Sequence, residues 1–545
     1  MSAVMEVSEP SADSLNDLQP PLVQHFELMA TAPGGVTRLR ELILTLAVQG
    51  KLVPQDPTDE LASELLRKIR TEKSLSIGGG KNKRGDSPAA ILEEDFPYTL
   101  PMTWEWIRNQ DLFSLRKGKN PKALSETPIG KPYLDIEALD RHQVRRYSED
   151  ATALTCSADD ILVVCDGSRS GLILQGKDGI VGSTLAVIEC SKLVQPYLRL
   201  IFREGFQRYN SGMKGAAIPH LDTKTVLTEV IGLPPLAEQT RIVTRVEELM
   251  SLCDALEAQG QLEATQHAQL VQTLLGALTA SASPDELADN WQRVATHFDL
   301  LLDRPEAIDA LEQTILQLAV RGLLSPPLPE DQQVVVGSRE DSPVPLPAAW
   351  SYVRLGGVLA DLRYGTAVKC AYDMVGHPVL RIPNLKNGSI DATDLKFGQL
   401  GTDDLAKLAL KRGDVLIVRS NGSASLVGSM AVVGPESEGF AFAGYLVRAR
   451  LNPALLTPEY LNLAAKTAAF REQIEGPIRT TSGVKNINSS EISRLSFALP
   501  PLGQQQHIVA RVDSLRRLCA DLRQRLTARQ TTQAHLAEAL IDEVA

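Results

Sequence analysis

LPPLAEQTRIVTRVEELMSLCDAL, residues Leu233–Leu256, decides the fold because the chain contains it twice. The pattern returns as LPPLGQQQHIVARVDSLRRLCADL at Leu499–Leu522. A second matching pair lies upstream, with ILTLAVQGKL at Ile43–Leu52 and ILQLAVRGLL at Ile315–Leu324. A long internal repeat indicates two copies of one structural plan. The segments between the matching pieces diverge, so we expect the shared pieces to do one mechanical task twice and the divergent pieces to contact different things.

Each copy of the LPPL segment leads into an apolar stripe whose positions step by four and three residues, as in a coiled coil. The stripe residues are Ile242, Val246, Leu249, Cys253 and Leu256 in the first copy, and Ile508, Val512, Leu515, Cys519 and Leu522 in the second. Both stripes weaken and then resume, the first at Leu270 and Leu274 and the second at Leu536 and Leu540. Pairing the two helices would bury both stripes. The alternative is two unrelated amphipathic helices on separate cores.

The predicted fold class is α+β, with two mixed α/β globular domains separated by a long antiparallel two-helix coiled coil and related by an internal pseudo-two-fold repeat. Strand-like segments include Ile161–Val164 and Val415–Val418, and Pro196–Tyr209 and Pro458–Ile474 resemble helices. The predicted parts, in chain order, are a flexible acidic N-terminus (1–30), an N-terminal helical region (31–75), a linker (76–99), a first globular domain (100–235), a central coiled-coil helix (236–281), a central helical region (282–323), a Pro-rich linker (324–346), a second globular domain (347–500) and a C-terminal coiled-coil helix (501–545).

Charge is distributed unevenly along the chain. The net charge is −11, but residues 236–345 alone carry −12, whereas residues 100–235 carry +1 and residues 346–500 carry +4. The two globular stretches can therefore have basic faces, although charge alone does not indicate a nucleic-acid partner. No apolar run reaches about 18 residues, so no membrane span is expected. The six cysteines are scattered without a C-x-x-C spacing, which is typical of reduced thiols.

Sequence motifs of the common active sites are missing. The chain has no G-x-x-x-x-G-K-[ST] loop, no Asn/Asp-Pro-Pro-aromatic tetrapeptide, no H-E-x-x-H, no paired Cys/His zinc spacing and no G-x-S-x-G. GSRSG at Gly167–Gly171 is interpreted as a turn, because no His/Asp partnership can be identified near it. We therefore predict a chain that is not an enzyme and holds no metal or cofactor.

Three kinds of segment carry a resemblance to a known family. They are APGGVTRLRELILTLAVQGKLVPQ at Ala32–Gln55, THFDLLLDRPEAIDALEQTILQLAVRGLL at Thr296–Leu324, and the two LPPL…Q…IV segments. Together with the layout, they resemble the specificity subunits of type I restriction–modification systems. The mid-chain segment is most similar to the enteric type IA group. The resemblance spans nearly the whole chain after about residue 30.

The resemblance implies a division of labour in phage defence. Two target-recognition domains would each read half of a split, asymmetric DNA sequence, and the coiled coil would set the spacer between the halves. Two modification subunits would dock on the repeated helical regions, bind S-adenosylmethionine and methylate adenine N6. Restriction subunits would join through them and use ATP and Mg²⁺. This chain would supply specificity and assembly in the cytoplasm, without an active site or a membrane contact.

Candidate DNA-binding residues are side chains on loops that suit phosphate or base edges. Lysine and arginine bind phosphate, while arginine, asparagine, glutamine and serine read base edges. The candidates are His142, Arg145, Arg146, Arg169, Lys214 and His220 in the first domain, and Arg419, Asn421, Ser423, Arg479, Thr480, Thr481 and Lys485 in the second. The loops NSGMKG and PIRTTSGVKNIN occupy matching places in the two halves. Ordinary solvated loops are the alternative interpretation.

Two other functions stay open at this point. A two-module scaffold that binds proteins and no nucleic acid would suit the acidic pI of about 5.4 and the 5% content of aromatic residues. A nuclease with an unrecognised site would cleave DNA in a metal-dependent manner as the purified chain alone. DNA binding that weakens steeply with salt would favour the DNA-reading hypothesis over the scaffold.

Overall fold

The computed structural model describes Phe26 and residues 28–76, 91–211, 220–329, 331–476, 479–481 and 484–544. Most of the predicted N-terminal part (1–30) and of the linker 76–99 lies outside these residues. The chain divides into two compact units, one of residues 1–261 with 530–545 and the other of residues 262–529. Each unit therefore contains one globular domain and a part of each long helix.

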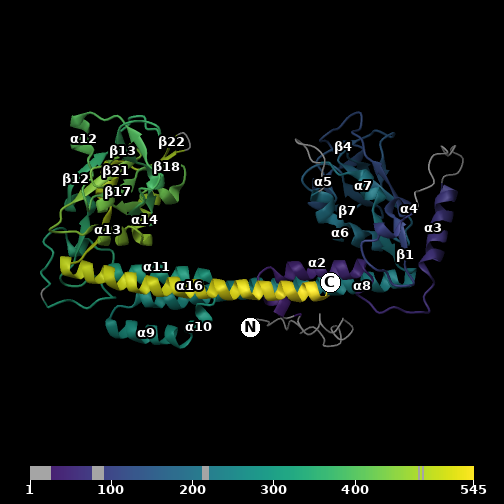
Figure 1. The fold of residues 1–545 in the computed structure, drawn as a ribbon, viewed down its shortest axis with the longest axis horizontal. Helices are drawn as coiled ribbons and strands as arrows, with labels where there is room; N and C mark the ends of the chain where they lie inside the picture. Colours follow the sequence, from purple (N-terminus) through teal and green to yellow (C-terminus); the bar gives the residue numbers. More distant parts are fainter. Residues whose placement is uncertain are drawn as a thin grey trace. The chain divides into compact units, whose positions relative to one another are not determined.

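Two long helices, α8 (Leu236–Ala280) and α16 (Leu502–Val544), follow the two LPPL segments and are single unbroken helices of 45 and 43 residues (Figure 1). Their entrances are built identically. The buried side chains of Gln239 and Gln505 each donate from Nε2 to the carbonyl of the proline five residues earlier, at 2.9 Å. These bonds satisfy carbonyls at the helix entrance and fix the direction in which each helix leaves its domain.

A shorter helix completes the helical core of each unit. In the first unit, α2 (Gly35–Val48) shares a core with the early part of α8 and with Ala537 of α16. In the second unit, α11 (Pro305–Val320) shares a core with the early part of α16 and with Leu275 of α8. Each apolar stripe thus packs inside its own unit, against a repeated helix and the opposite half of the other long helix, rather than against its twin stripe. This arrangement is antiparallel.

The buried positions of α8 shift after its middle. The sequence places the resumed stripe at Leu270 and Leu274, but Leu270 is 51% exposed, and Val271, Leu275 and Leu278 are buried instead. An α-helix has 3.6 residues per turn and drifts by about 20° per heptad relative to a strict 3.5-residue repeat. Leu270 lies four heptads after Ile242, and over that length the drift reaches about 80°, close to the roughly 100° between successive residues, so the buried face moves by one position.

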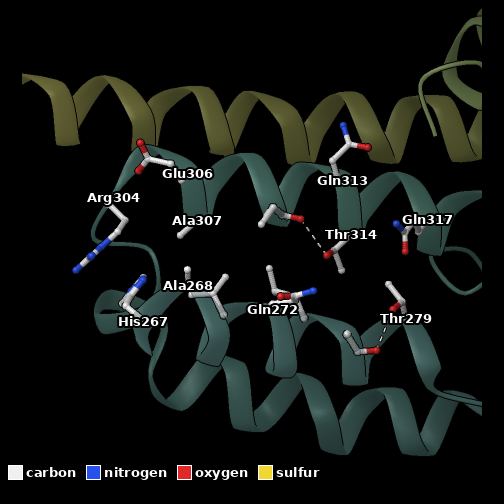
Figure 2. A pocket seen from close by; sticks show the side chains of 14 residues that line it. His267, Ala268, Gln272, Thr279, Arg304, Glu306, Ala307, Gln313, Thr314 and Gln317 are labelled. Atoms are coloured by element: carbon white, nitrogen blue, oxygen red, sulfur yellow. Dashed lines mark hydrogen bonds between the residues drawn. The ribbon is translucent and has the colours of Figure 1, made fainter. Parts of the chain in front are cut away.

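A cleft of about 340 Å³ lies between the later part of α8 and α11 in the second unit. Figure 2 shows Ala268 and Gln272 of α8 facing Ala307 and Thr314 of α11 across it. The hydroxyl of Thr314 is satisfied within its own helix, by donation to the carbonyl of Ala310 at 3.0 Å. Small side chains on both helices therefore leave space between them that larger apolar residues would fill.

One ion pair between the repeated helices is present in both units with its charges exchanged. In the first unit, Arg40 of α2 lies 3.0 Å from Glu257 of α8. In the second unit, the position equivalent to Arg40 is Glu312 of α11, and the position equivalent to Glu257 is Arg523 of α16. These two side chains lie 3.3 Å apart. The duplicated frame has kept the contact and reversed its polarity.

Each globular domain is joined to its long helix by a short two-stranded sheet. Strand β1 (Glu105–Arg108) pairs antiparallel with β10 (Val230–Leu233), and β11 (Ser351–Arg354) pairs antiparallel with β24 (Ser496–Leu499). A buried tryptophan precedes the first strand of each pair. Trp104 Nε1 donates to Glu238 at 3.0 Å, and Trp350 donates to the equivalent Gln504. The sheet and the indole bond fix the domain on the helix entrance.

The first domain consists of two four-stranded sheets flanked by helices. The fully antiparallel sheet runs β2 (Phe113–Lys117), β9 (Leu185–Cys190), β6 (Ile161–Val164), β7 (Ile173–Gln175), and the mixed sheet runs β4 (Tyr147–Ser148), β3 (Lys131–Leu134), β8 (Gly179–Val181), β5 (Thr155–Cys156). Besides α2 and the parts of the two long helices, the described residues of this unit form α3 (Ala62–Ser76), α4 (Asn109–Leu112), α5 (Ile136–Asp140), α6 (Gln195–Ser211) and α7 (Thr223–Thr228).

The second domain is larger and has three sheets besides β11–β24. The largest sheet has the strand order β12 (Leu359–Tyr364), β21 (Leu446–Leu451), β17 (Val415–Val418), β19 (Met430–Val432), β15 (Ser389–Ile390), β14 (Leu385–Lys386). The second sheet has the order β16 (Lys396–Gly398), β13 (His377–Leu380), β20 (Ala441–Phe442). The third has the order β18 (Ser420–Asn421), β23 (Val484–Asn486), β22 (Arg479–Thr481). Helices α9 (Pro284–Thr296) and α10 (Phe298–Leu301) precede α11, and α12 (Thr402–Leu408) and α15 (Ser489–Arg494) lie in the domain.

The helix predicted over Pro458–Ile474 is two helices. α13 (Pro458–Ala464) ends and α14 (Ala468–Glu475) begins around Thr467, whose hydroxyl donates to the carbonyl of Ala464 at 2.7 Å. This local bond replaces a regular helical turn, because threonine side chains compete for backbone carbonyls. Within the described residues, no helix is long and apolar enough to cross a membrane.

Candidate nucleic-acid interface

The turn after β6 organises the candidate residues of the first domain. It holds the predicted GSRSG turn, in which Gly167 and Gly171 adopt φ values of 108° and 91°. Asp166 opens the turn and accepts from His220 Nδ1 at 2.7 Å and from Lys117 Nζ at 2.9 Å. Burial alone would raise the pKa of Asp166, but the bonds from His220 and Lys117 outweigh it and hold the pKa below its usual value.

The same turn carries Arg169, which reaches the end of α5. Its Nη1 lies 2.7 Å from Asp140, and this bond lowers the pKa of the Asp140 carboxyl. The adjacent His142 has a left-handed backbone with φ of 58°, and its ring nitrogen lies 2.8 Å from Lys177 Nζ. The structure therefore brings Arg169, His142 and the unpredicted Lys177 together at one exposed end of the domain.

Arg145 and Arg146 are also paired with carboxylates of α5 and the residue before it. Arg145 lies 2.9 Å from Glu137, and Arg146 lies 2.8 Å from Asp135 and stacks 4.8 Å above the ring of Tyr133. Exposed ion pairs contribute only about 0–1 kcal/mol each. A DNA phosphate can therefore replace the carboxylate at small cost. Lys214 lies outside the described residues.

In the second domain, the two candidate loops form one small sheet. Strand β18 pairs with β23, and β23 pairs with β22, so Asn421 stands opposite Lys485 and Lys485 stands opposite Thr480. Arg479 and Thr481 lie on the same strand as Thr480. The sequence could not show this pairing, because more than 50 residues separate the two loops.

Arg419 precedes that sheet and stacks on an aromatic ring. Its guanidinium carbon lies 4.8 Å above the ring of Tyr364, and Nε makes no hydrogen bond within the described residues. Beside it, Asn421 accepts from the backbone N–H of Ser423 at 2.9 Å, and the Ser423 hydroxyl lies 2.9 Å from that of Ser425. A planar arginine braced by an aromatic ring is well suited to bidentate recognition of a guanine edge.

Strand register identifies equivalent positions in the two domains. On the central strand β9 of the first domain, Lys117 and Val163 flank Ala186. On the central strand β21 of the second domain, Tyr364 and Ile417 flank Val447, which is equivalent to Ala186. Lys117 and Tyr364 therefore occupy the same place in the fold, although one is a cation and the other an aromatic ring.

The bridge that closes each site is equivalent as well. In the first domain, Asp166 and His220 form an isolated antiparallel β-bridge. In the second, Ser420 and Asn486 pair in the same way within the β18–β23 ladder. The same backbone junction thus presents an ionic group of side chains in one domain and neutral polar side chains beside a stacked arginine in the other.

Sequence reasoning missed several side chains at these sites. Lys117 and Tyr364 end strands whose long-range partners were unknown, and no local motif marks them. Tyr372 was also missed, although it is 60% exposed and lies 4.8 Å from Lys396 Nζ and 5.5 Å from the guanidinium carbon of Arg381. Tyr372 is the only Phe, Trp or Tyr between residues 369 and 396, so no local aromatic pattern marks it.

The two domains share one arrangement of strands, but they carry different polar side chains at the same junction. The chain is therefore a protein with two distinct recognition modules. The sequence profile of the type I restriction modification DNA specificity domain matches residues 101–266 and 347–529. The EcoEI and EcoAI type I restriction enzyme specificity subunits of Escherichia coli are 30% and 31% identical to this chain, over 93% of each chain.

A chain from a solved structure on complex assembly and conformational transition of the type I R-M system has a TM-score of 0.48 and 19% identity, covering 82% of this chain and 99% of that one. The family itself rests on the sequence matches. This chain belongs to the type I restriction–modification specificity subunits. The predicted membership is confirmed, and with it the α+β class with a repeated domain and the assignment to a non-catalytic subunit.

Proposed function

We propose that the two domains read the two unlike halves of a split, asymmetric sequence in double-stranded DNA. The observation that supports this proposal is the equivalent junction with different chemistry. In the first domain it carries Lys117, Asp166 and His220, and in the second it carries Tyr364 and Arg419. Base edges are distinguished by their patterns of hydrogen-bond donors and acceptors. Two domains that recognise different sequences therefore need different side chains at the same place in the same backbone arrangement.

The other predicted candidates extend these junctions. His142, Arg145, Arg146 and Arg169 lie near α5 and would bind phosphate, while Lys485 of β23 stands opposite Asn421 of β18. Phosphate contacts position a protein on DNA and base contacts specify the sequence. We therefore assign the arginines of the first domain to positioning, and Arg419 and Asn421 to base reading.

The repeated helices would provide the assembly surface of the complex and set the spacer between the two half-sequences. In this proposal two modification subunits dock on the repeated helical regions, one for each unit, and restriction subunits join through them. The stripe residues themselves are mostly buried within their own units, so partners would contact the outer faces of these helices. S-adenosylmethionine, ATP and Mg²⁺ would bind the partner subunits, and the complex would act in the cytoplasm.

A binding experiment tests the DNA-reading proposal. The full chain is mixed with its modification subunit, and the affinity for labelled duplex DNA is measured by fluorescence anisotropy from 50 to about 200 mM salt. Neutralising about six phosphates or more would weaken binding by roughly 10³-fold over this range. An affinity absent even at low salt, with assembly intact, would instead identify a protein-only scaffold.

A further inference from the structure

A cavity of about 650 Å³ lies wholly within the second unit, and its lining includes Ser425, whose hydroxyl lies 2.9 Å from that of Ser423 at the junction described above. Its walls come from the tip of the β14–β15 hairpin, the loop before β19, helices α13 and α14, and one residue each of α11 and α16. Side chains of α13 and the turn after it hold the hairpin tip in place. Asn462 Nδ2 donates to the carbonyl of Gly388 at 3.3 Å, and Lys466 Nζ donates to that of Asn387 at 3.3 Å.

The lining of this cavity is basic, with four cations and no carboxylate. Two of the cations are already engaged. Lys386 lies 2.6 Å from Asp391, and Arg471 binds the carbonyls of the 424–427 loop and Glu475. The positive charges of Lys466 and Arg516 remain. Burial lowers the pKa of Lys466, and the like charge of Arg516 lowers it further against an opposing effect of Asp513.

Two buried polar atoms on the cavity residues have no hydrogen-bond partner within the described part of the chain. They are Nε of Arg516, which can only donate, and Oδ1 of Asn462, which can only accept. Leaving a buried polar group without a hydrogen-bond partner is unfavourable. A ligand that supplies both an anionic oxygen and a hydroxyl or N–H group would satisfy both atoms at once.

Arg516 is not part of the duplicated plan, whereas Lys466 corresponds to Arg203. Arg516 of α16 corresponds to Met250 of α8, which is buried in the core of the first unit. Asn462 corresponds to Arg199, whose Nη2 donates to Gln175. A modification subunit that docks once on each unit would rely on features that both units share. A ligand whose binding depends on Arg516 would therefore bind the second unit alone.

We propose that this cavity binds a phosphate ester of nucleotide size, with Arg516 and Lys466 facing the phosphate and Asn462 Oδ1 accepting from a hydroxyl or amine. The volume lies within the usual range of small-molecule sites. A DNA duplex is too broad to enter it, so the proposed ligand is a small molecule, and the DNA affinity of the Arg516→Met variant separates it from the DNA target. The apolar side chains of Leu385, Leu426 and Met430 supply a wall for the non-phosphate part of the molecule.

Calorimetric titration of the full chain tests this assignment with four probes: AMP, ribose 5-phosphate, inorganic phosphate and adenosine. We expect the phosphate-bearing probes to bind and adenosine not to bind. The order of AMP against ribose 5-phosphate then distinguishes a nucleotide site from a sugar-phosphate site. Arg516→Met, which installs the residue found at the equivalent place in the first unit, should weaken binding at least about tenfold.

Arg517→Met is the matched control, since Arg517 is the next residue on α16 and is exposed. It should leave phosphate binding unchanged, and both variants should keep wild-type circular dichroism and wild-type DNA affinity. Retained DNA binding separates this site from DNA reading. The proposal is wrong if no phosphate-bearing probe binds at millimolar concentration, or if Arg516→Met and Arg517→Met bind equally. It is also wrong if Arg516→Met impairs only assembly with the modification subunit, which would identify an acidic protein group as the occupant.

Discussion

The two globular domains use the same backbone junction for different chemistry. In the first, Asp166 gathers Lys117 and His220 into an ionic group. In the second, the equivalent strands present Arg419 stacked on Tyr364. The strand pairings next to both sites are equivalent, whereas the side chains at the equivalent positions differ in charge and type. Duplication has preserved the frame that positions a reader and has left the reading surface free to diverge.

The repeated helices differ in another way, because the ion pair between them is preserved in both units and only the places of the positive and negative residues are exchanged. Arg40 with Glu257 in the first unit corresponds to Glu312 with Arg523 in the second. If α2 and α11 exchanged places during folding, Arg40 would face Arg523 and Glu312 would face Glu257. Like charges at these positions are destabilising, so the exchanged polarity favours the correct pairing of two similar helices.

Among the variants that test the difference between the two domains, Arg419→Ala is expected to have the largest effect on sequence recognition. Losing one bidentate base contact costs about 1–3 kcal/mol of discrimination. Sequencing the methylome of cells that express the variant with its modification subunit should show one relaxed position in one half-sequence and an unchanged other half. His220→Ala is the mirror variant and should relax the opposite half.

Arg412→Ala is the control for Arg419→Ala, since Arg412 is an exposed arginine in the turn before β17. It should leave both half-sequences unchanged. Relaxation of both halves by Arg419→Ala alone would show that the two domains do not read independently.

A smaller effect is expected from reversing one charge of the helical frame. Arg523→Glu places a carboxylate against Asp309 and Glu312 and should destabilise the second unit by about 1 kcal/mol. Adding Glu312→Arg gives the second unit the polarity of the first and should recover part of this loss. Urea unfolding followed by circular dichroism measures both, with Arg517→Glu as an exposed control. Equal stability of the single and double variants would remove the ion pair from the explanation.

The smallest effect concerns the buried partner of each tryptophan, which is Glu238 in the first unit and Gln504 in the second. Burial chiefly raises the pKa of Glu238, against the bonds from Trp104 and Gln55. The folded chain therefore holds this proton more tightly than the unfolded chain does. Its contribution to stability is greatest below the ordinary pKa near 4.5 and is lost as pH rises through the higher folded pKa.

Glu238→Gln copies the residue of the second unit and should remove this pH dependence, with a gain of under about 1 kcal/mol at neutral pH. Gln504→Glu should introduce the same dependence into the second unit. Thermal unfolding between pH 4 and 8 measures the difference. A Glu238→Gln curve parallel to wild type over that interval would contradict the predicted sign.

Patterns that depend on neighbouring residues could be predicted from the sequence, and contacts between distant segments could not. The heptads and LPPL entrances predicted helices close to the observed bounds of α8 and α16. The drift that buries Val271 in place of Leu270 depends on the true helical period, and the break near Thr467 depends on one side-chain bond. Lys117 and Tyr364 became candidates only when strand register placed them beside Asp166 and Arg419.

The proposal that the long helices set the gap between two independent half-sequences has a direct measurement. Four residues are inserted into α8 after Gln261 and four into α16 after Arg529, which adds about one turn, or 6 Å, to each helix. At 3.4 Å per base pair this corresponds to one or two base pairs of DNA. We predict a methylome with both half-sequences unchanged and a longer gap between them; an altered half-sequence with an unaltered gap would contradict it.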